Sequence, residues 1–269
     1  DAWISVATRD GPRKIRPDQI LEPGVLRPDW PRPDLNLACY ELLVGLVHLV
    51  DPPADNADWH ARTRTPDPTR LRDRLAAFGF AFELLGDGPR FLQDIEPLDG
   101  EPLPADALFI DSAGAKTAKD NADLMVRTGR YTALPADLAA MALYTMQAFA
   151  PVGGAGIRAS MRGGGPMVTL VEPIIDQDPT PLWSMVWVNT PCGAPISAGI
   201  AEAALPWLRP TRMSSAKGSE TYPDEKAITS PECFFGMPRR LRLLSDDEGT
   251  VTGARQRPHG TNYAGWVHP

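Results

Sequence analysis

The sequence predicts a loop-rich α+β fold. The chain has 29 prolines and 23 glycines among its 269 residues, so much of it is expected to form loops and short elements. Hydrophobic residues make up 43% of the chain, which at this length is enough for a large core in one domain or two. Segments with helical periodicity and segments with strand composition both occur, and no internal repeat organises them.

The first part of the chain contains a strand and two helices. Residues 3–7 (WISVA) have the composition of a short strand. Asp34 precedes an apolar segment that runs to Val50 and stops before two prolines, which predicts a helix in the core. A second helix is expected from Asp67 toward Leu85, because four apolar side chains there share one helical face.

The rest of the chain mixes both types. A helix is expected over residues 136–148, because Pro135 suits the start of a helix. Residues 182–189 are apolar and aromatic and fit a helix or a strand. Further expectations are strands at 89–93 and 167–171, an exposed loop at 94–104, a flexible polar segment at 207–224, two strands within 234–244 and a strand from Val251.

Charge and residue types exclude several classes of protein. The net charge of −7 argues against a free-standing nucleic-acid-binding protein, although a subunit that touches nucleic acid through one strip remains compatible with it. The 3 cysteines are far apart and odd in number, so no disulfide framework is expected and a reducing cytoplasm is the default. The 4 histidines lack ligand spacing, so we expect no metal and no cofactor. The longest apolar run is too short to span a bilayer, so we expect no membrane contact.

The most informative segment is PVGGAGIRASMRGGGP, residues 151–166. Glycine lets a main chain approach a partner closely, and the guanidinium groups of Arg158 and Arg162 suit phosphate. Two other clusters of basic residues occur, at 62–74 and 116–130, and Arg255 and Arg257 add to the cations near the glycines. The pattern favours a loop that lies against a polyanion.

Two alternatives stay open from the residues alone. Residues 154–159 (GAGIRA) formally match the dinucleotide fingerprint GxGxx(G/A), which would make the chain an oxidoreductase; that motif needs a strand before it and a helix after it. The other alternative is a purely structural scaffold subunit. We find no catalytic constellation and expect no enzymatic activity.

A set of short motifs occurs in order along the chain: WISV (3–6), ELLV (41–44), WHAR (59–62), RFLQ (90–93), DSAG (111–114), DLMV (123–126), RGGGP (162–166), FFGMPRR (234–240) and NYAGWVHP (262–269). Together these motifs cover nearly the whole chain, and the set is specific although no single motif is. In this order they resemble the N-terminal domain of the CasA family, the large subunit of the type I-E CRISPR Cascade complex.

The resemblance implies one irregular, loop-rich α+β domain over residues 1–269, without the family's C-terminal four-helix bundle. It implies a non-enzymatic subunit that inspects double-stranded DNA for the protospacer-adjacent motif (PAM) before the guide RNA pairs with the target, in antiviral defence. Readout from the minor groove is degenerate, so tolerance of several motifs is expected. Because the sequence starts at Asp1 without methionine and stops within a matched motif, we expect a trimmed piece of a longer subunit.

The resemblance also assigns residues by position. PAM recognition is expected from Gly153, Gly154, Ala155, Gly156 and Arg257. Contacts to the DNA backbone are expected from Lys116, Lys119, Arg158, Arg162 and Arg255. The 5′ handle of the crRNA is expected against Leu124, Met125, Val126 and Arg127. The implied partners are crRNA, double-stranded target DNA, the backbone, 5′-handle-binding and small subunits of Cascade, and a helicase–nuclease or a fused nuclease domain.

Overall fold

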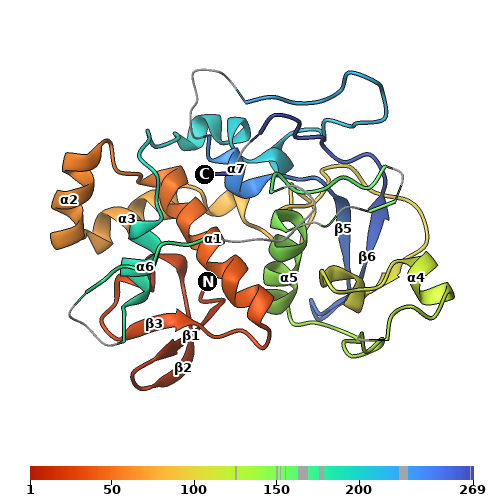
Figure 1. The fold of residues 1–269 in the computed structure, drawn as a ribbon, viewed down its shortest axis with the longest axis horizontal. Coiled ribbons are helices and arrows are strands. Elements are labelled where there is room, and N and C mark those ends of the chain that lie inside the picture. The colour runs from red at the N-terminus through yellow and green to blue at the C-terminus, as the bar shows by residue number, and fades with distance from the viewer. Residues whose placement is uncertain are drawn as a thin grey trace.

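The computed structural model describes residues 1–269 except residues 125, 150, 152, 155, 163–168, 176–178, 224–229 and 267. The chain opens with a three-stranded antiparallel sheet, in which β1 (Ile4–Thr8) lies between β2 (Gly11–Ile15) and β3 (Val25–Pro28) (Figure 1). Ile4 and Val6 are fully buried, because alternate side chains of a strand face the same side. The predicted opening strand is confirmed.

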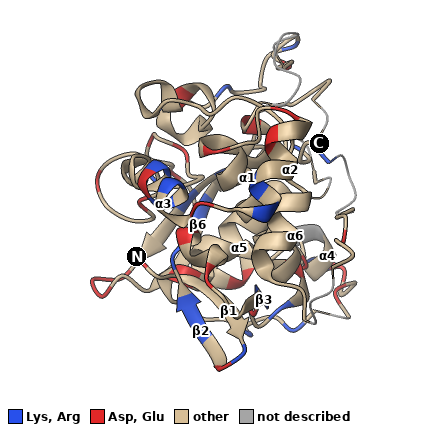
Figure 2. Cartoon of the chain, turned by 90° about the vertical axis from the view of Figure 1, so that its left-hand side faces the viewer, with Lys and Arg blue, Asp and Glu red and all other residues tan. Residues whose placement is uncertain are grey.

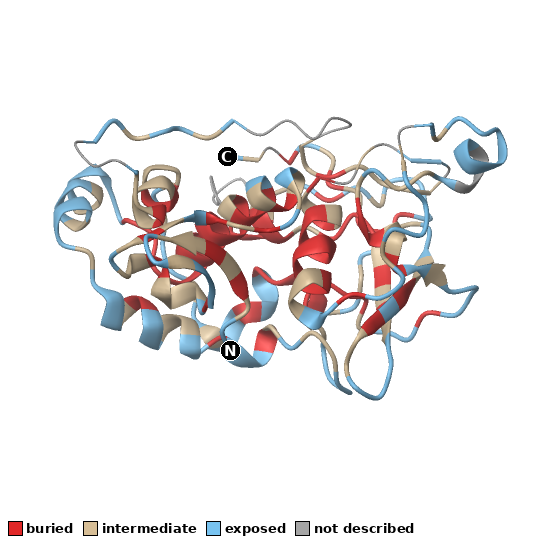
Figure 3. Cartoon of the chain, turned by 90° about the horizontal axis from the view of Figure 1, so that it is seen from below, coloured by how far each residue is buried: buried red, intermediate tan, exposed pale blue. Residues whose placement is uncertain are grey.

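The central helix α1 (Pro33–Val50) is buried on nearly all sides, as its sequence predicts. Asp34 lies in its first turn, where the helix dipole favours a negative charge. By length and composition alone α1 would suit a membrane span, with a mean hydropathy of 1.3, but 72% of it is buried inside the protein. It is therefore packed as a core helix (Figure 3).

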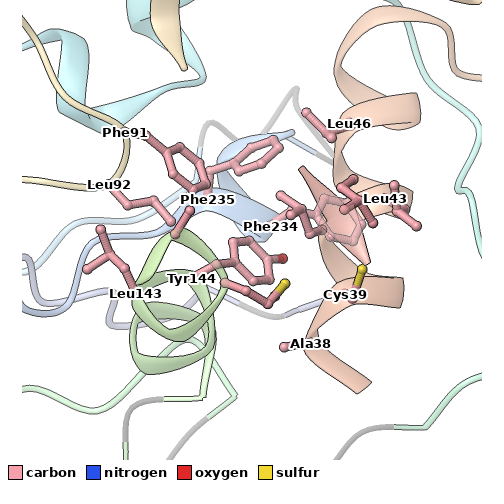
Figure 4. Close-up of a cluster of buried hydrophobic side chains, with 14 of the residues drawn as sticks. Ala38, Cys39, Leu43, Leu46, Phe91, Leu92, Leu143, Tyr144, Phe234 and Phe235 are labelled. Atoms are coloured by element: carbon pink, nitrogen blue, oxygen red, sulfur yellow. The ribbon is translucent and has the colours of Figure 1, made fainter. Parts of the chain in front are cut away.

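Two further helices pack against α1, namely α5 (Ala136–Ala148) and α7 (Glu232–Phe235). Figure 4 shows side chains of α1 facing Tyr144 of α5 and Phe234 of α7. A Cβ atom added at Gly45 of α1 would lie 2.6 Å from the Cβ atom of Phe234, so only glycine allows α7 to approach this closely. The predicted helix at 136–148 is confirmed.

The second sheet lies on the other side of α5 from α1 (Figure 1). It is antiparallel, with β6 (Val251–Arg257) between β4 (Leu103–Pro104) and β5 (Arg240–Ser245). Because the two sheets are antiparallel and separated by helices, the predicted α+β class is confirmed. The predicted strand that begins at Val251 is confirmed as well.

The helices α2 (Asn56–Arg64) and α3 (Pro68–Ala76) follow α1, and each begins after an aspartate whose carboxylate accepts a backbone hydrogen bond. The predicted extension of α3 to Leu85 is wrong, since α3 ends at Ala76 and a single 3-10 turn, η2 (Gly79–Ala81), replaces the rest. The remaining elements are η1 (Pro17–Leu21), η3 (Ala105–Leu108), α4 (Ala115–Lys119), α6 (Leu182–Val188), η4 (Ala198–Ala203) and η5 (Pro206–Leu208).

Two predicted strands are absent from the described residues. Residues 89–93 form a loop, buried from Phe91 to Gln93, and not a strand. The Gln93 side chain pairs with the backbone there: it donates to the Leu84 carbonyl at 2.7 Å and accepts from Leu243 N–H at 2.9 Å. The first of the two strands expected within 234–244 is replaced by α7, and the second is β5. Of the strand expected at 167–171, residues 167 and 168 lie outside the described residues and the other three are not extended in a sheet.

Two segments that the sequence predicts to be exposed or flexible contain buried residues. Asp94 was expected in an exposed loop, but it is buried and pairs with Arg240 at 2.5 Å. Trp207 was expected in a flexible segment, but it is fully buried and its indole N–H donates to the Ala81 carbonyl. Both were missed because their partners are distant in the sequence.

Candidate nucleic-acid interface

The glycine loop, which comprises residues 151–162, follows α5 and reaches the surface of the protein. Gly153 and Gly154 are exposed, and a Cβ atom added at Gly154 would meet no described atom within 4 Å. Two predicted members of this loop, Val152 and Ala155, lie outside the described residues. Gly154 therefore offers bare backbone to the outside.

The loop is fastened to the end of β6 through Gly156. The backbone N–H of His259 donates to the Gly156 carbonyl oxygen at 2.6 Å. A Cβ atom at Gly156 would lie 2.8 Å from the Cβ atom of Pro258, and Gly156 has a φ of +76°, a conformation that favours glycine. Because Pro258 directly follows Arg257, the fold brings the two parts of the predicted PAM-reading surface together. Their role in reading DNA stays a prediction.

The end of β6 carries two of the predicted basic residues. Arg257 is exposed and pairs with the exposed carboxylate of Asp99 at 2.5 Å. Such surface pairs contribute little free energy, so the Arg257 guanidinium is available to an external anion. Arg255 is half-buried, and its Nε donates to the Gly100 carbonyl at 3.3 Å.

Arg158 connects the glycine loop to a neighbouring segment. Its Nε and Nη2 atoms donate to the hydroxyl and carbonyl oxygens of Ser214, at 2.7 and 2.8 Å. The Ser214 hydroxyl in turn donates to the Gly260 carbonyl at 2.6 Å. Arg158 thus helps to attach the loop to the chain that follows β6, and its predicted contact with a DNA phosphate stays a prediction.

Arg162 lies in the interior, which corrects its predicted role as a DNA-backbone contact. Its side chain is only 8% exposed, and its Nη2 atom lies 2.6 Å from the Glu41 carboxylate. The same nitrogen donates to the imidazole Nε2 of His268 at 2.6 Å, and the guanidinium stacks over Phe149. A guanidinium enclosed by a carboxylate, an imidazole and a phenyl ring cannot also hold a phosphate at the surface.

The titration of this buried cluster follows from its contacts. Burial raises the pKa of Glu41, and the nearby Arg162 charge opposes that shift. Burial lowers the pKa of His268 to about 3, and Arg162 adds to the lowering. His268 is therefore neutral, with Nε2 accepting from Arg162 and Nδ1 facing the Pro269 carbonyl at 3.0 Å. The cluster links the downstream end of the glycine loop to α1.

The residues assigned to the crRNA handle lie in an exposed segment that follows α4. Leu124 is 89% exposed, Arg127 is exposed and Val126 is half-buried, whereas Met125 lies outside the described residues. A single exposed apolar side chain is normal on a protein surface, so the contact of Leu124 with the crRNA handle stays a prediction. Lys119 of α4 is exposed, and the Lys116 side chain is not described. α4 projects from the side of the molecule that carries β6 (Figure 1).

The basic residues of α2 and α3 form ion pairs within the protein. The carboxylate of Asp51, which is 3% exposed, pairs with the guanidinium groups of Arg62, Arg70 and Arg74. Arg62 and Arg74 also donate to backbone carbonyls at the C-terminal end of α1, where the helix dipole favours cations. Figure 2 shows these cations on α3 beside acidic groups. The cluster serves mainly to join α2 and α3 to α1.

The geometry does not fit the dinucleotide alternative. The GAGIRA segment follows a helix instead of a strand, and no helix begins within the described part of residues 153–162. A cavity of about 640 Å³ is lined by Trp3, Leu42, Phe82 and neighbours, and no residue of the glycine loop takes part in it. In the part of the chain that the structure describes, no group of three or more His, Cys, Asp or Glu side chains could hold a metal ion.

Sequence reasoning missed Arg239, which lies beneath the glycine loop. Its Nη2 donates to the Pro151 carbonyl at 2.5 Å, at the start of the loop. Its backbone exchanges two hydrogen bonds with the buried amide of Gln147, at 2.9 and 3.0 Å. Burial lowers the pKa of Arg239 to about 10. The only signal in the sequence was its position in the FFGMPRR motif.

Fold and site together define an α+β protein that presents an exposed glycine loop and a basic strand end on one surface. The model of the CRISPR-associated protein Cse1 family matches residues 1–269, so the chain belongs to the Cse1 family.

Solved structures of this family share the fold. Thermus thermophilus CasA (Cse1) is 21% identical with a TM-score of 0.67, and the alignment covers 100% of this chain and 55% of that one. Thermobifida fusca Cse1 is 17% identical with a TM-score of 0.65, over 98% of this chain and 51% of that one. A chain of a CRISPR RNA-guided surveillance complex is 15% identical with a TM-score of 0.65, over 100% and 57%. The chain therefore spans about half the length of these relatives.

Proposed function

We propose that this chain is the DNA-inspecting part of the large subunit of a type I-E Cascade complex, and that it recognises the PAM in double-stranded DNA and supports pairing of the target strand with crRNA. The observation that carries the proposal is the hydrogen bond between Gly156 and His259, which holds the glycine loop beside the exposed Arg257. Backbone without side chains, as at Gly153 and Gly154, can enter a groove about 6 Å wide, and a neighbouring guanidinium can pair with the phosphates that border it.

Family membership supports the same partners. A similar fold occurs within a CRISPR RNA-guided surveillance complex, so we expect crRNA and the backbone, 5′-handle-binding and small subunits as partners, in the cytoplasm. The exposed side chains of Leu124 and Arg127 offer an apolar contact and a cation to the crRNA handle. The subunit itself needs no catalytic residue, because cleavage falls to a helicase–nuclease or a fused nuclease domain. Its net charge of −7 suits a subunit that uses local cations within a larger assembly.

The test uses Gly154→Leu in the full-length subunit, assembled with crRNA and its partner subunits. A Cβ atom added at Gly154 meets no described atom within 4 Å, so the side chain starts in open space, where the DNA would lie. Gly88→Leu is the matched control, because Gly88 is also exposed with no atom within 4 Å of an added Cβ. We expect Gly154→Leu to abolish PAM-dependent duplex binding and Gly88→Leu to leave it unchanged. Equal binding by the two variants would contradict the proposal.

A further inference from the structure

Arg239 is a buried cation with no counter-charge among the described residues. It is 5% exposed, and no described carboxylate lies within ion-pair distance of it. Its Nε and Nη1 atoms have no hydrogen-bond partner in the part of the chain that the structure describes. An uncompensated buried charge costs free energy, and an apolar side chain of similar size would be at least as stable at such a position. Stability of the fold therefore does not explain why arginine occupies it.

Among the described residues, the one hydrogen bond of the Arg239 side chain is to the glycine loop. Nη2 donates to the Pro151 carbonyl, and Nη1 lies 3.2 Å from the position that a Cβ atom at Gly153 would take. The guanidinium thus lies directly beneath the first residues of the loop. The two hydrogen bonds between Gln147 and the Arg239 backbone fix its position relative to α5.

We infer that Arg239 is a positioning residue for motif recognition: it sets the height of the glycine loop above the second sheet, so that the bare backbone at Gly153 and Gly154 reaches the DNA groove. This inference rests on the proposed function. Three other contacts hold the loop farther along, through Gly156, Arg158 and Arg162, and Arg239 is the contact at the upstream end. Without it, the first residues of the loop lose their support while the downstream attachment stays.

The neighbouring Arg240 provides a matched control. It lies next to Arg239 in the sequence, but its Nε pairs with the buried carboxylate of Asp94 at 2.5 Å, and it forms no hydrogen bond with a described residue of the glycine loop. Arg239→Met and Arg240→Met remove the same charge one residue apart. The inference predicts that Arg239→Met lowers motif selectivity and keeps stability, because it removes a costly buried charge that supports the loop. It predicts that Arg240→Met lowers stability and keeps selectivity, because it leaves a buried carboxylate without its partner.

The experiment measures both variants in the full-length subunit assembled with crRNA and partner subunits. The two readouts are Tm and the ratio of binding between preferred and disfavoured motifs in a duplex library randomised at the motif. Arg239→Met is expected to keep the wild-type Tm and to narrow this ratio by roughly tenfold, the scale of a lost charged hydrogen bond. Arg240→Met is expected to lower Tm by roughly 10 °C and to keep the ratio. If the wild-type complex is selective and Arg239→Met shows the same binding ratio, the inference is overturned.

Two further outcomes are informative. If the wild-type complex shows no motif dependence, the proposed function fails, whatever Arg239 does. If Arg239→Met does not assemble, hydrogen exchange of the subunit alone decides: faster exchange at the amide of Ile157, which donates to the Gly154 carbonyl, with the amides of His259 and β5 still protected, supports positioning. Unchanged exchange at the Ile157 amide overturns it.

Discussion

The N–H of His259 and the carbonyl of Gly156 form a 2.6 Å hydrogen bond between two segments that are about a hundred positions apart in the chain. His259 itself has a φ of 67°, unusual for a residue with a side chain, so the turn after β6 adopts a costly conformation at this contact. Strain of this kind persists only where the surrounding structure holds it. We interpret the contact as the joint that fixes the glycine loop beside Arg257.

Gly156→Val is expected to break this joint. The added Cβ would lie 2.8 Å from the Pro258 Cβ and 2.9 Å from the imidazole of His259, and valine resists positive φ. We expect a loss of PAM-dependent binding together with a destabilisation of roughly 1–3 kcal/mol in urea unfolding. Gly86→Val is the control. Gly86 also has a positive φ, but no atom lies within 4 Å of an added Cβ, so this variant has the backbone strain without the close contact. If Gly86→Val and Gly156→Val lose the same binding, the joint has no special role.

Arg257→Ala is expected to weaken target binding through charge. If Arg257 contacts one phosphate, the slope of log K against log salt becomes shallower by about 0.9. Arg13, an exposed arginine of β2 that also pairs with a surface carboxylate, is the control and is expected to leave the slope unchanged. Identical slopes for wild type and Arg257→Ala in a salt series would remove Arg257 from the interface.

Gly45→Ala is expected to destabilise the core. The methyl group would meet the Phe234 side chain at 2.6 and 2.9 Å, and this overpacking outweighs the gain in helix propensity. We expect a loss of roughly 1–2 kcal/mol in chemical denaturation. Gly79→Ala, where the methyl group meets nothing within 4 Å, should be neutral or stabilising. Equal stability of the two variants would contradict the packing of α7 on α1.

Removing one partner of the buried Glu41–Arg162 pair should lower the free energy of unfolding more than removing both. Arg162→Met leaves the buried carboxylate uncompensated, with an expected loss of about 3–5 kcal/mol. The double variant Glu41→Met with Arg162→Met should recover most of that loss, since no charge remains unpaired. A double-mutant cycle measures the difference, and simple additivity of the two single losses would contradict the pairing.

Stability should fall as the pH falls below about 6.5, the ordinary pKa of histidine. The pKa of His268 is about 3 in the folded protein because of burial and Arg162, so the unfolded state binds more protons in this window. Between about pH 6.5 and 3 this histidine lowers stability by at most about 1.4 kcal/mol per pH unit, and above pH 7 it has no effect. Glu41, with its pKa raised by burial, acts in the opposite direction.

His268→Gln isolates the histidine, because glutamine can still accept from Arg162 and Glu41 is present in both proteins. The variant should show a smaller acid-dependent loss of unfolding free energy between pH 6.5 and 5, measured by urea titration at each pH. Parallel curves for the two proteins would mean that His268 is protonated in the folded state.

Local patterns predicted the elements that depend on short-range sequence. The apolar segment after Asp34 and the segment after Pro135 gave correct helices because their burial is nearly uniform and a proline marks the start of each. The strand expected around Phe91 was wrong, because Gln93 satisfies the backbone there with its side chain.

The candidate site was predictable only in part. Glycine content and the motif order located the loop and Arg257, since both are visible as residue types. The role of each arginine could not be predicted from the sequence, because it depends on partners that are distant in the chain. Arg162 pairs with Glu41 of α1, and Arg239 donates to the carbonyl of Pro151. A cation that binds phosphate and one that holds a loop have the same appearance in a sequence.

The central claim is that the backbone at Gly154 touches the motif. Its most direct test places a photo-crosslinking amino acid at position 154 in the assembled complex with target duplex, and maps the crosslinked nucleotides. The account predicts crosslinks within the base pairs of the motif, lost when the duplex lacks it. Crosslinks only to protein, or to guide RNA, would contradict it.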